Sequence, residues 1–366
     1  MKFICNTQSL CEGVTNVQRA VSSKATLPAL EGILIATDGD KIILSGYDLE
    51  IAIKTSVEAN VVVEGCIVVK AHVFSEIIKR AHTETISVEV DDNMNIIVRY
   101  GGCAFSIAAI DANDYPELPP IEENDSIEID GELLRSMVSE TIFSVSQSDD
   151  KPVHTGILFE IADGNIRLVA VDSTRFAIRN ERIGGDKNMR FIIPAKTLNE
   201  VLKLIDDGDT VKISIDSRHV SFNIGDFLVI SRLLDGDFLD VTSIPDNRTT
   251  IATINTQDFL AAIDRMSPLI VERLASPVRC IFEDDTIYLK CETSVGKASD
   301  NIDCSIDGEQ LEIGFNSRYM IETLRAIEDE QIKIVFGGPN QAIRIIPVEG
   351  ESFHYLIMPI RLKENR

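Results

Sequence analysis

The sequence predicts an α+β protein built from three repeated domains, in each of which two helices back antiparallel sheets. Three observations favour this fold class. One helical pattern recurs twice at a spacing of about 120 residues, a second helical pattern precedes each copy of the first, and alternating apolar runs with turn signals lie between them. At 366 residues the chain is also too long for one ordinary hydrophobic core.

The second helix of each repeat gives the clearest match between copies. Residues 74–81 (FSEIIKRA), 198–205 (LNEVLKLI) and 320–327 (MIETLRAI) each carry a Glu at the third place, an aliphatic residue at the fifth and a Lys or Arg at the sixth. The copies start 124 and 122 residues apart. Apolar residues at i, i+4 and i+7 predict amphipathic helices.

The first helix of each repeat carries a longer apolar stripe. We expect Thr7, Asp130 and Thr256, which precede the stripes, to be the N-caps. The apolar positions are Leu10, Val14, Val17 and Val21 in the first repeat, Leu134, Val138, Ile142 and Val145 in the second, and Phe259, Ile263, Met266 and Ile270 in the third.

The segments between the helices predict hairpins. GILIATDGDKIILSGYDLEIAI from Gly32 matches GILFEIADGNIRLVAVDSTRFAI from Gly156, and an Asp-Gly pair breaks each one. That pair between alternating apolar runs is a strong hairpin signal. The third copy has Asp284-Asp285 at the turn. A strand-rich segment then follows each second helix.

Acidic segments that contain proline end the first two repeats. They predict an N-terminal domain over residues 1–122, a central domain over 123–247 and a C-terminal domain over 248–366. Duplication that serves no shared task is the alternative explanation of the repeat.

Composition limits the class of protein. With 59 acidic and 35 basic residues the formal charge is −24, which argues against a protein that grips DNA through its whole surface. No apolar run approaches the ~18 residues that span a membrane, and the start MKFICNTQSL lacks the apolar stretch of a signal peptide. Seven cysteines without a C-x-x-C pair indicate reduced thiols in a cytoplasmic protein and argue against a zinc site.

Catalytic motifs are missing from the sequence. The five histidines form no H-E-x-x-H pattern, and there is no G-x-S-x-G, Walker A or G-x-G-x-x-G motif. We therefore expect a binding protein that is not an enzyme and needs no metal or cofactor. An acid–base pair assembled only in the fold remains an alternative.

Five short motifs and the repeat together carry a resemblance to a known family. They are TLPAL (26–30), YDLE (47–50), DYPELP (114–119), IGFNSRY (313–319) and MPIRL (358–362). The chain resembles the β subunits of bacterial DNA polymerase III, the replication sliding clamps, over essentially its whole length. The resemblance implies a head-to-tail homodimer that closes into a ring around double-stranded DNA, independently of sequence, and confers processivity. A ring holds DNA by topology, so an acidic chain needs cations only locally.

The resemblance and the repeat together suggest which cations face DNA. Lys79, Lys203 and Arg325 recur on the second helices, and Arg135 and Arg265 lie on first helices, as does Arg19. Lys24 holds the family's usual DNA-contacting loop position. The full expected set is Lys24, Lys79, Arg80, Arg135, Lys196, Lys203, Arg265 and Arg325. For any one of them, an ordinary solvated helix charge is the alternative.

The resemblance also implies a hydrophobic groove that binds short peptides similar to Gln-Leu-Ser-Leu-Phe. The expected partners are the DNA polymerase III α subunit, the clamp loader and other proteins with such a motif. Two or three buried side chains at roughly 1.5–3 kcal/mol each, less ordering costs, predict about micromolar affinity. The expected groove residues are Val171, Thr174, Arg175, Phe176, Leu239, Ile244, Leu274, Asn316, Tyr319, Leu356, Met358, Pro359, Ile360 and Arg361.

Some positions depart from the family pattern. Ser173-Thr174 replaces a common Gly-His, His154 stands where an aliphatic residue is usual, and four residues follow Leu362. For ring closure we expect the edge strand of the N-terminal domain, with Phe105 and Ile107, to face Leu269 of the other subunit.

Two other classes of function are compatible with parts of the sequence. A hydrolase or isomerase with a dispersed site would need a clustered acid–base set, and a monomeric scaffold would not need cations in all three repeats. The clamp accounts for the groove, the cations and the repeat together.

Overall fold

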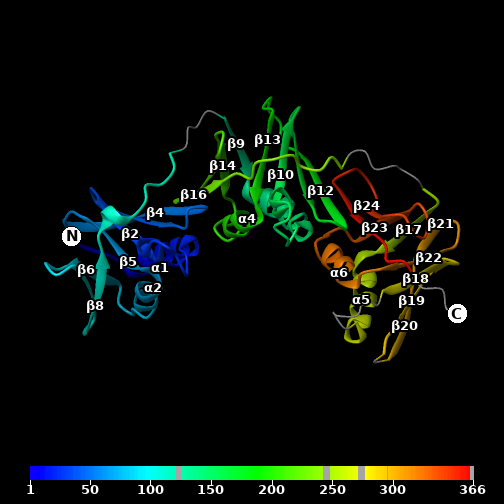
Figure 1. The fold of residues 1–366 in the computed structure, drawn as a ribbon, viewed down its shortest axis with the longest axis horizontal. Coiled ribbons are helices and arrows are strands. Elements are labelled where there is room, and N and C mark those ends of the chain that lie inside the picture. The colour runs from blue at the N-terminus through cyan, green and yellow to red at the C-terminus, as the bar shows by residue number, and fades with distance from the viewer. Residues whose placement is uncertain (121–124, 242–247, 271–276, 295, 363–366) are drawn as a thin grey trace. The chain divides into compact units, whose positions relative to one another are not determined.

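The computed structural model describes residues 1–120, 125–241, 248–270, 277–294 and 296–362 (Figure 1). Each repeat opens with a strand, continues through a helix, a run of strands and a second helix, and ends with three strands. The predicted order of helix, strands, helix and strands misses the opening strand. That strand is only five or six residues long in each repeat, which is too short for its alternation to be a clear signal.

The first repeat contains β1 (Lys2–Asn6), α1 (Thr7–Val17), β2 (Gly32–Asp38), β3 (Lys41–Tyr47), β4 (Ile51–Val63), β5 (Cys66–Lys70), α2 (Ala71–Lys79), β6 (Thr85–Val90), β7 (Asn95–Tyr100) and β8 (Cys103–Ile110). The second contains β9 (Asp125–Asp130), α3 (Gly131–Ser139), β10 (Gly156–Ala162), β11 (Asn165–Val171), β12 (Arg175–Arg182), β13 (Met189–Pro194), α4 (Ala195–Val201), β14 (Thr210–Ile215), β15 (His219–Ile224) and β16 (Phe227–Arg232). The third contains β17 (Thr250–Asn255), α5 (Thr256–Met266), β18 (Val278–Glu283), β19 (Thr286–Glu292), β20 (Lys297–Asp303), β21 (Ser305–Gly308), β22 (Leu311–Phe315), α6 (Ser317–Arg325), β23 (Gln331–Phe336), β24 (Ile343–Pro347) and β25 (Phe353–Ile357).

The first helices are shorter than their apolar stripes predict. Val21, Ile142, Val145 and Ile270 fall beyond the ends of α1, α3 and α5, where short 3₁₀ turns follow. After α5 the cause is Pro268, which has no N–H to continue the helix and restricts the residue before it. The remaining stripe residues are buried as expected.

Two of the three expected N-caps are wrong. Asn6 and Asn255, one residue earlier than Thr7 and Thr256, each accept two first-turn N–H groups at 2.9–3.1 Å. The asparagine side chain satisfies two unpaired donors, whereas the two threonines are buried. Asp130 accepts a first-turn N–H at 2.9 Å, as predicted.

The predicted hairpin turns form in all three repeats. Asp163-Gly164 and Asp284-Asp285 have φ between 50° and 74°, as a two-residue turn with the strands' own twist requires. In the first repeat the turn lies one residue later than predicted, at Gly39-Asp40, because Asp38 pairs with Lys41.

The chain folds into two compact units, residues 1–134 with 196–233 and residues 135–195 with 234–366, so the central repeat contributes to both. The first unit holds a sheet in the order β1-β6-β7-β8-β5-β2-β3-β4-β16-β15-β14-β9. Strand β1 also pairs with β4, which closes the strands of the first repeat on themselves. Helix α1 packs against β4 and α2.

The second unit holds two sheets. The larger has the order β13-β10-β11-β12-β25-β24-β23-β17-β21, and the smaller has the order β20-β19-β18-β22. Helices α5 and α6 pack against each other, and their buried faces share one apolar core with both sheets of the third repeat. Among the described residues, no helix has the length and apolar character needed to cross a bilayer.

One type of joint between repeats occurs in each unit. Strand β16, the last of the second repeat, pairs with β4 of the first, with Val229 opposite Ile53. Strand β25, the last of the third repeat, pairs with β12 of the second, with Tyr355 opposite Ala177. Strands β4 and β12 hold the same place in their repeats, as do β16 and β25, so the two joints are equivalent.

Three of the quoted motifs meet at the first joint. Leu30 of TLPAL, Tyr47 of YDLE and Tyr115 of DYPELP lie in one apolar cluster with Ala52 on β4 and Ile230 on β16. These motifs therefore build the junction between the first two repeats.

Candidate functional site

The C-terminal segment, which we define as residues 358–362, follows β25 and is tied down at two points. The Met358 N–H donates to the Thr174 carbonyl at 2.8 Å, and the Ile360 N–H donates to the Gly314 carbonyl at 2.8 Å. The Met358 side chain is 46% exposed although its backbone is held. A flexible apolar side chain is thus presented at a fixed place.

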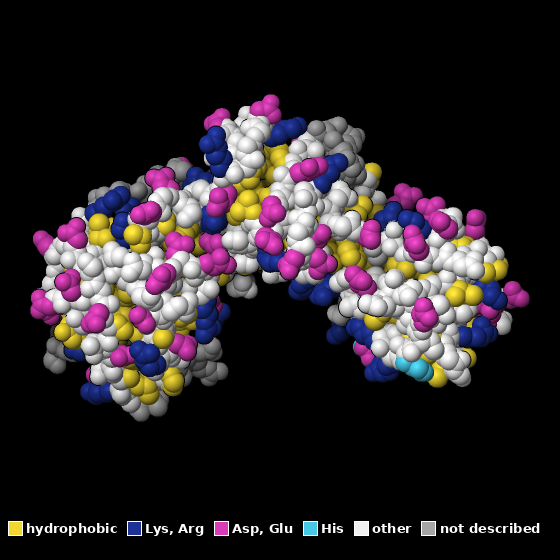
Figure 2. Space-filling model, turned by 180° about the vertical axis from the view of Figure 1, so that it is seen from behind, with side chains coloured by type: hydrophobic (Ala, Val, Ile, Leu, Met, Phe, Trp, Pro, Cys, Tyr) yellow, Lys and Arg dark blue, Asp and Glu magenta, His cyan; other side chains and the backbone are white. Residues whose placement is uncertain are grey.

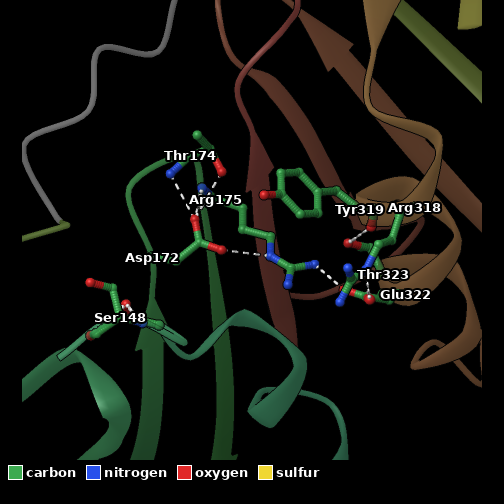
Figure 3. Close-up of polar contacts among 9 residues, drawn as sticks. Ser148, Asp172, Thr174, Arg175, Arg318, Tyr319, Glu322 and Thr323 are labelled. Carbon is green, nitrogen blue, oxygen red and sulfur yellow. Dashed lines mark hydrogen bonds and ion pairs between the residues drawn. The ribbon is translucent and has the colours of Figure 1, made fainter. Parts of the chain in front are cut away.

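Arg175 at the start of β12 lies beside this segment and reaches α6 (Figure 3). Its guanidinium forms ion pairs with Asp172, at 2.9 Å, and with Glu322. The guanidinium carbon also lies 4.3 Å from the centroid of the Tyr319 ring, a cation–π geometry. Because Arg175 is only 7% exposed, these contacts satisfy a charge that would be costly to bury alone.

Asp172 shapes the turn before β12. One of its carboxylate oxygens accepts the Thr174 N–H at 2.7 Å, the Thr174 hydroxyl at 2.9 Å and the Arg175 N–H at 2.9 Å. The Thr174 side chain is thus bound within the turn. The turn holds the carbonyl that anchors Met358.

Tyr319 is positioned by the start of α6. The Asn316 side chain caps this helix by accepting the Arg318 N–H at 3.0 Å. One turn further on, burial raises the pKa of the Glu322 carboxyl, but hydrogen bonds from Arg318 and Arg175 outweigh burial and hold that pKa below its ordinary value of 4.5. Glu322 therefore stays charged and keeps Arg175 against the Tyr319 ring.

The apolar groove candidates divide into buried and exposed sets. Val171, Phe176 and Leu356 are at most 5% exposed and lie in one core cluster, so they support the groove from below. Leu239 is 51% exposed and lines a pocket of about 170 Å³. Pro359 and Ile360 are half-buried and Arg361 is exposed. Ile244 and Leu274 lie outside the described residues.

His154 packs against an aromatic ring. Its ring lies 5.5 Å from that of Phe238, edge to face, within the apolar surroundings of the same core cluster. Burial, with a smaller contribution from Lys151, lowers the pKa of His154 below its ordinary value of 6.5. The imidazole is thus neutral at pH 7 and serves as a packing residue.

The expected DNA-facing cations are mostly exposed, but many are already paired with carboxylates. Lys24, Lys79, Arg80, Lys196, Lys203, Arg265 and Arg325 are exposed, and Arg135 is half-buried. The ion pairs are Arg80–Glu76, Lys196–Asp48 at 2.7 Å, Lys203–Glu200 at 2.8 Å, Arg265–Asp300 and Arg325–Asp264 at 3.3 Å. Figure 2 shows the same mixture, with Asp and Glu side chains lying among Lys and Arg side chains.

The expected dimer residues lie at strand edges. Phe105 and Ile107 are half-buried on β8, where the Phe105 ring stacks on Tyr100 at 5.6 Å. In the described chain β8 pairs with β7 along its length and with β5 only at its end, and β20 pairs with β19 alone. Leu269 is half-buried and lies close to Gly296, next to the start of β20.

Sequence reasoning missed three residues that contact Arg175 or the C-terminal segment. Asp172, Glu322 and Gly314 were not expected to have a role there, although Glu322 occupies the repeated Glu position of the second helices. The equivalent Glu76 and Glu200 are also ion-paired. The repeated Glu and cation in the sequence could therefore have predicted that Glu322 forms an ion pair. Within the described part of the chain no group of three or more His, Cys, Asp or Glu side chains is placed to hold a metal ion.

Comparisons with known proteins agree along the whole chain. Family models for the N-terminal, central and C-terminal domains of the DNA polymerase III beta subunit match residues 1–119, 128–240 and 242–361. The chain belongs to the DNA polymerase III beta subunit family. The beta sliding clamp of Bacillus subtilis is 35% identical, over 99% of this chain and 100% of the relative.

Solved structures of this family share the fold. The crystal structure of the DNA polymerase sliding clamp from Bacillus subtilis has a TM-score of 0.96 at 34% identity, covering 99% of this chain and 100% of the other. That of a putative beta subunit from Eubacterium rectale has a TM-score of 0.95 at 30% identity, covering 98% and 99%. Membership confirms the predicted fold class of three clamp domains and the predicted role of a DNA sliding clamp, a processivity factor that is not itself catalytic.

Proposed function

We propose that this sliding clamp closes as a head-to-tail homodimer around double-stranded DNA, with domains at residues 1–122, 123–247 and 248–366. The observation that carries the proposal is the repeated joint. The last strand of the second repeat pairs with β4, and the last strand of the third pairs with β12. Two strands in equivalent positions form no such joint within the described chain: β8, the last strand of the first repeat, and β20, which holds in the third repeat the place of β4 and β12. A third joint of the same type would therefore join two copies.

The two existing joints support one register for the third. Counted from the hairpin that precedes each strand, Cys103 on β8 corresponds to Phe227 on β16 and Phe353 on β25. Counted in the same way, Asp300 on β20 corresponds to Thr55 on β4 and Arg179 on β12. Phe227 lies opposite Thr55, and Phe353 lies opposite Arg179. Cys103 of one copy would then lie opposite Asp300 of the other.

The same register places the apolar side chains of the two edges together. Phe105 would lie opposite Ala298, and Ile107 opposite Gly296, which is close to Leu269. This agrees with the expected contact of Phe105 and Ile107 with Leu269. Pairing would also cover two strand edges that otherwise invite aggregation.

The DNA-facing surface carries Lys24, Lys79, Lys203 and Arg325 with the other expected cations, and it acts without reading sequence. Because a closed ring holds DNA by topology, weak phosphate contacts suffice and strong ones would slow sliding. Pairing of the cations with carboxylates is consistent with weak contacts. The clamp works in the cytoplasm.

Partner proteins bind in the groove between the β12 turn, α6 and the C-terminal segment. Met358 and Leu239 supply exposed apolar surface, and Tyr319 supplies a ring held by Arg175. Methionine adapts to different shapes, which suits one groove that serves the DNA polymerase III α subunit, the clamp loader and other proteins with the same peptide motif.

Fluorescence anisotropy with a labelled peptide that ends in Gln-Leu-Ser-Leu-Phe tests the groove. Met358→Ala and Tyr319→Ala each remove a contact and should weaken binding roughly tenfold or more. Met94→Ala and Tyr288→Ala are the controls, since the Met94 and Tyr288 side chains are 41% and 39% exposed and lie elsewhere. Equal affinity of all four variants would contradict the groove.

A further inference from the structure

We propose that Gly314 is a positioning residue for partner binding: with Leu362 it seats the C-terminal segment and so sets the place of Met358 in the groove. The proposal rests on the proposed groove. It assigns a role to the contact between β22 and residues 360–362.

The contact between Gly314 and the C-terminal segment is too close for a side chain unless the segment shifts. A Cβ atom added at Gly314 would lie 2.5 Å from Leu362 Cδ2, 3.0 Å from the Ile360 carbonyl oxygen and 3.1 Å from Leu362 Cγ. All three distances are below ordinary van der Waals contact for a Cβ. An alanine at position 314 would therefore require the Leu362 side chain to move and the Ile360 carbonyl to shift by a few tenths of an ångström.

Backbone conformation does not explain this glycine. The turn glycines of the chain, such as Gly164 at φ 74°, adopt left-handed angles that other residues avoid, whereas Gly314 lies within the regular strand β22 without a positive φ. Strand interiors disfavour glycine unless another part of the chain approaches closely. Close approach of residues 360–362 is what the structure shows.

The segment covers the outer edge of its sheet. Strand β22 is the last strand of the smaller sheet, and β18 is its neighbour there. On the edge of β22 away from β18, the Gly314 carbonyl accepts the Ile360 N–H at 2.8 Å. The other tie, from the Met358 N–H to the Thr174 carbonyl, fixes the segment to the end of β12. Met358 and Pro359 are thereby stretched between the two sheets of the second unit.

Fixing this segment before a partner arrives lowers the cost of binding. A free C-terminal segment would lose conformational freedom when a peptide docks on Met358, and that loss would weaken affinity. With both ties in place the backbone is already ordered, and only the Met358 side chain adapts. A side chain at position 314 would lift residues 360–362 and loosen the second tie.

Two measurements on the intact protein test this. The first is anisotropy with the labelled Gln-Leu-Ser-Leu-Phe peptide, and the second is amide hydrogen exchange at Met358 and Ile360 without peptide. Gly314→Ala should weaken peptide binding by roughly tenfold and speed exchange at Ile360. Gly102→Ala is the matched control, because a Cβ there meets nothing within 4 Å.

Leu362→Ala is the second variant, since it removes the same contact without adding an atom to β22. It should speed exchange at Ile360 and weaken the peptide even if Gly314→Ala fails to fold. Suppose that the wild-type protein binds the peptide, and that the folded variants show the same affinity and the same amide exchange as the wild type. That result would overturn the role of Gly314 but would not contradict the groove. Failure of the wild-type protein to bind the peptide would overturn the groove and this inference with it.

Discussion

Arg175 shows how much of the site depends on one side chain. It joins the turn before β12 to α6 through ion pairs with Asp172 and Glu322 and lies against the Tyr319 ring. Removing a buried cation leaves its carboxylates without compensation, which costs more than the pair itself contributes. The charge therefore stabilises the fold of the second unit and the position of the Tyr319 ring.

Arg175→Met tests this at the residue scale. Methionine fills similar space without the charge, so the melting temperature should fall by about 5 °C or more in differential scanning calorimetry. Arg318→Met removes a partner of the same Glu322, but Arg318 is 68% exposed, and the fall should be about 2 °C or less. Equal shifts for the two variants would show that burial of Arg175 does not matter.

At the scale of elements, local pattern was sufficient to find the helices and hairpins, although it misplaced the ends of the first helices and two of their N-caps. The Glu and cation of each second helix, and the Asp-Gly or Asp-Asp turns, are encoded within a few residues. The joints are not, since Val229 and Ile53 pair across a long stretch of sequence. The site residues also fall into a predicted and an unpredicted group. The resemblance pointed to Met358 and Tyr319. Asp172, Glu322 and Gly314 act only through contacts that folding creates, so the sequence did not indicate them.

The proposed third joint can be trapped chemically. Asp300→Cys would place a thiol opposite the native Cys103 of a second copy, within the distance that a cross-strand disulfide spans. Mild oxidation should then give a covalent dimer on a non-reducing gel. Two controls should give no covalent dimer. One is Asp303→Cys, which places the thiol three residues further along β20, and the other is Asp300→Cys combined with Cys103→Ser, which removes the partner thiol. A non-covalent dimer that fails to cross-link would refute this register, and a monomer in solution would refute the joint.

At the scale of the whole molecule, the distribution of charge matters more than its sum. The net charge of −24 predicts a weak grip on DNA, and the structure adds that cations expected to face DNA are held by nearby carboxylates. Glu200 on α4 is the clearest case, because it pairs with Lys203 at 2.8 Å and with Arg19 at 3.7 Å. Such pairs limit how many phosphates the surface can neutralise.

Glu200→Gln should free Lys203 and Arg19 for phosphate contacts. Binding of a short labelled duplex at low salt should tighten, and the slope of log K against log salt should steepen by about 1–2. Glu349→Gln, an exposed site in the loop before β25, removes the same charge elsewhere and should leave the slope unchanged. Identical slopes for both variants would mean that Glu200 does not lie on the DNA face.

Retention on DNA tests the central claim most directly. The protein is loaded onto a nicked circular plasmid with a clamp loader from a related bacterium, the complex is washed in high salt, and the plasmid is then cut once. A ring held by topology survives the salt on circles and leaves after linearisation, which is the predicted result. Loss from circles and linear DNA alike, with a loader that retains its own clamp on the same plasmid, would contradict the account.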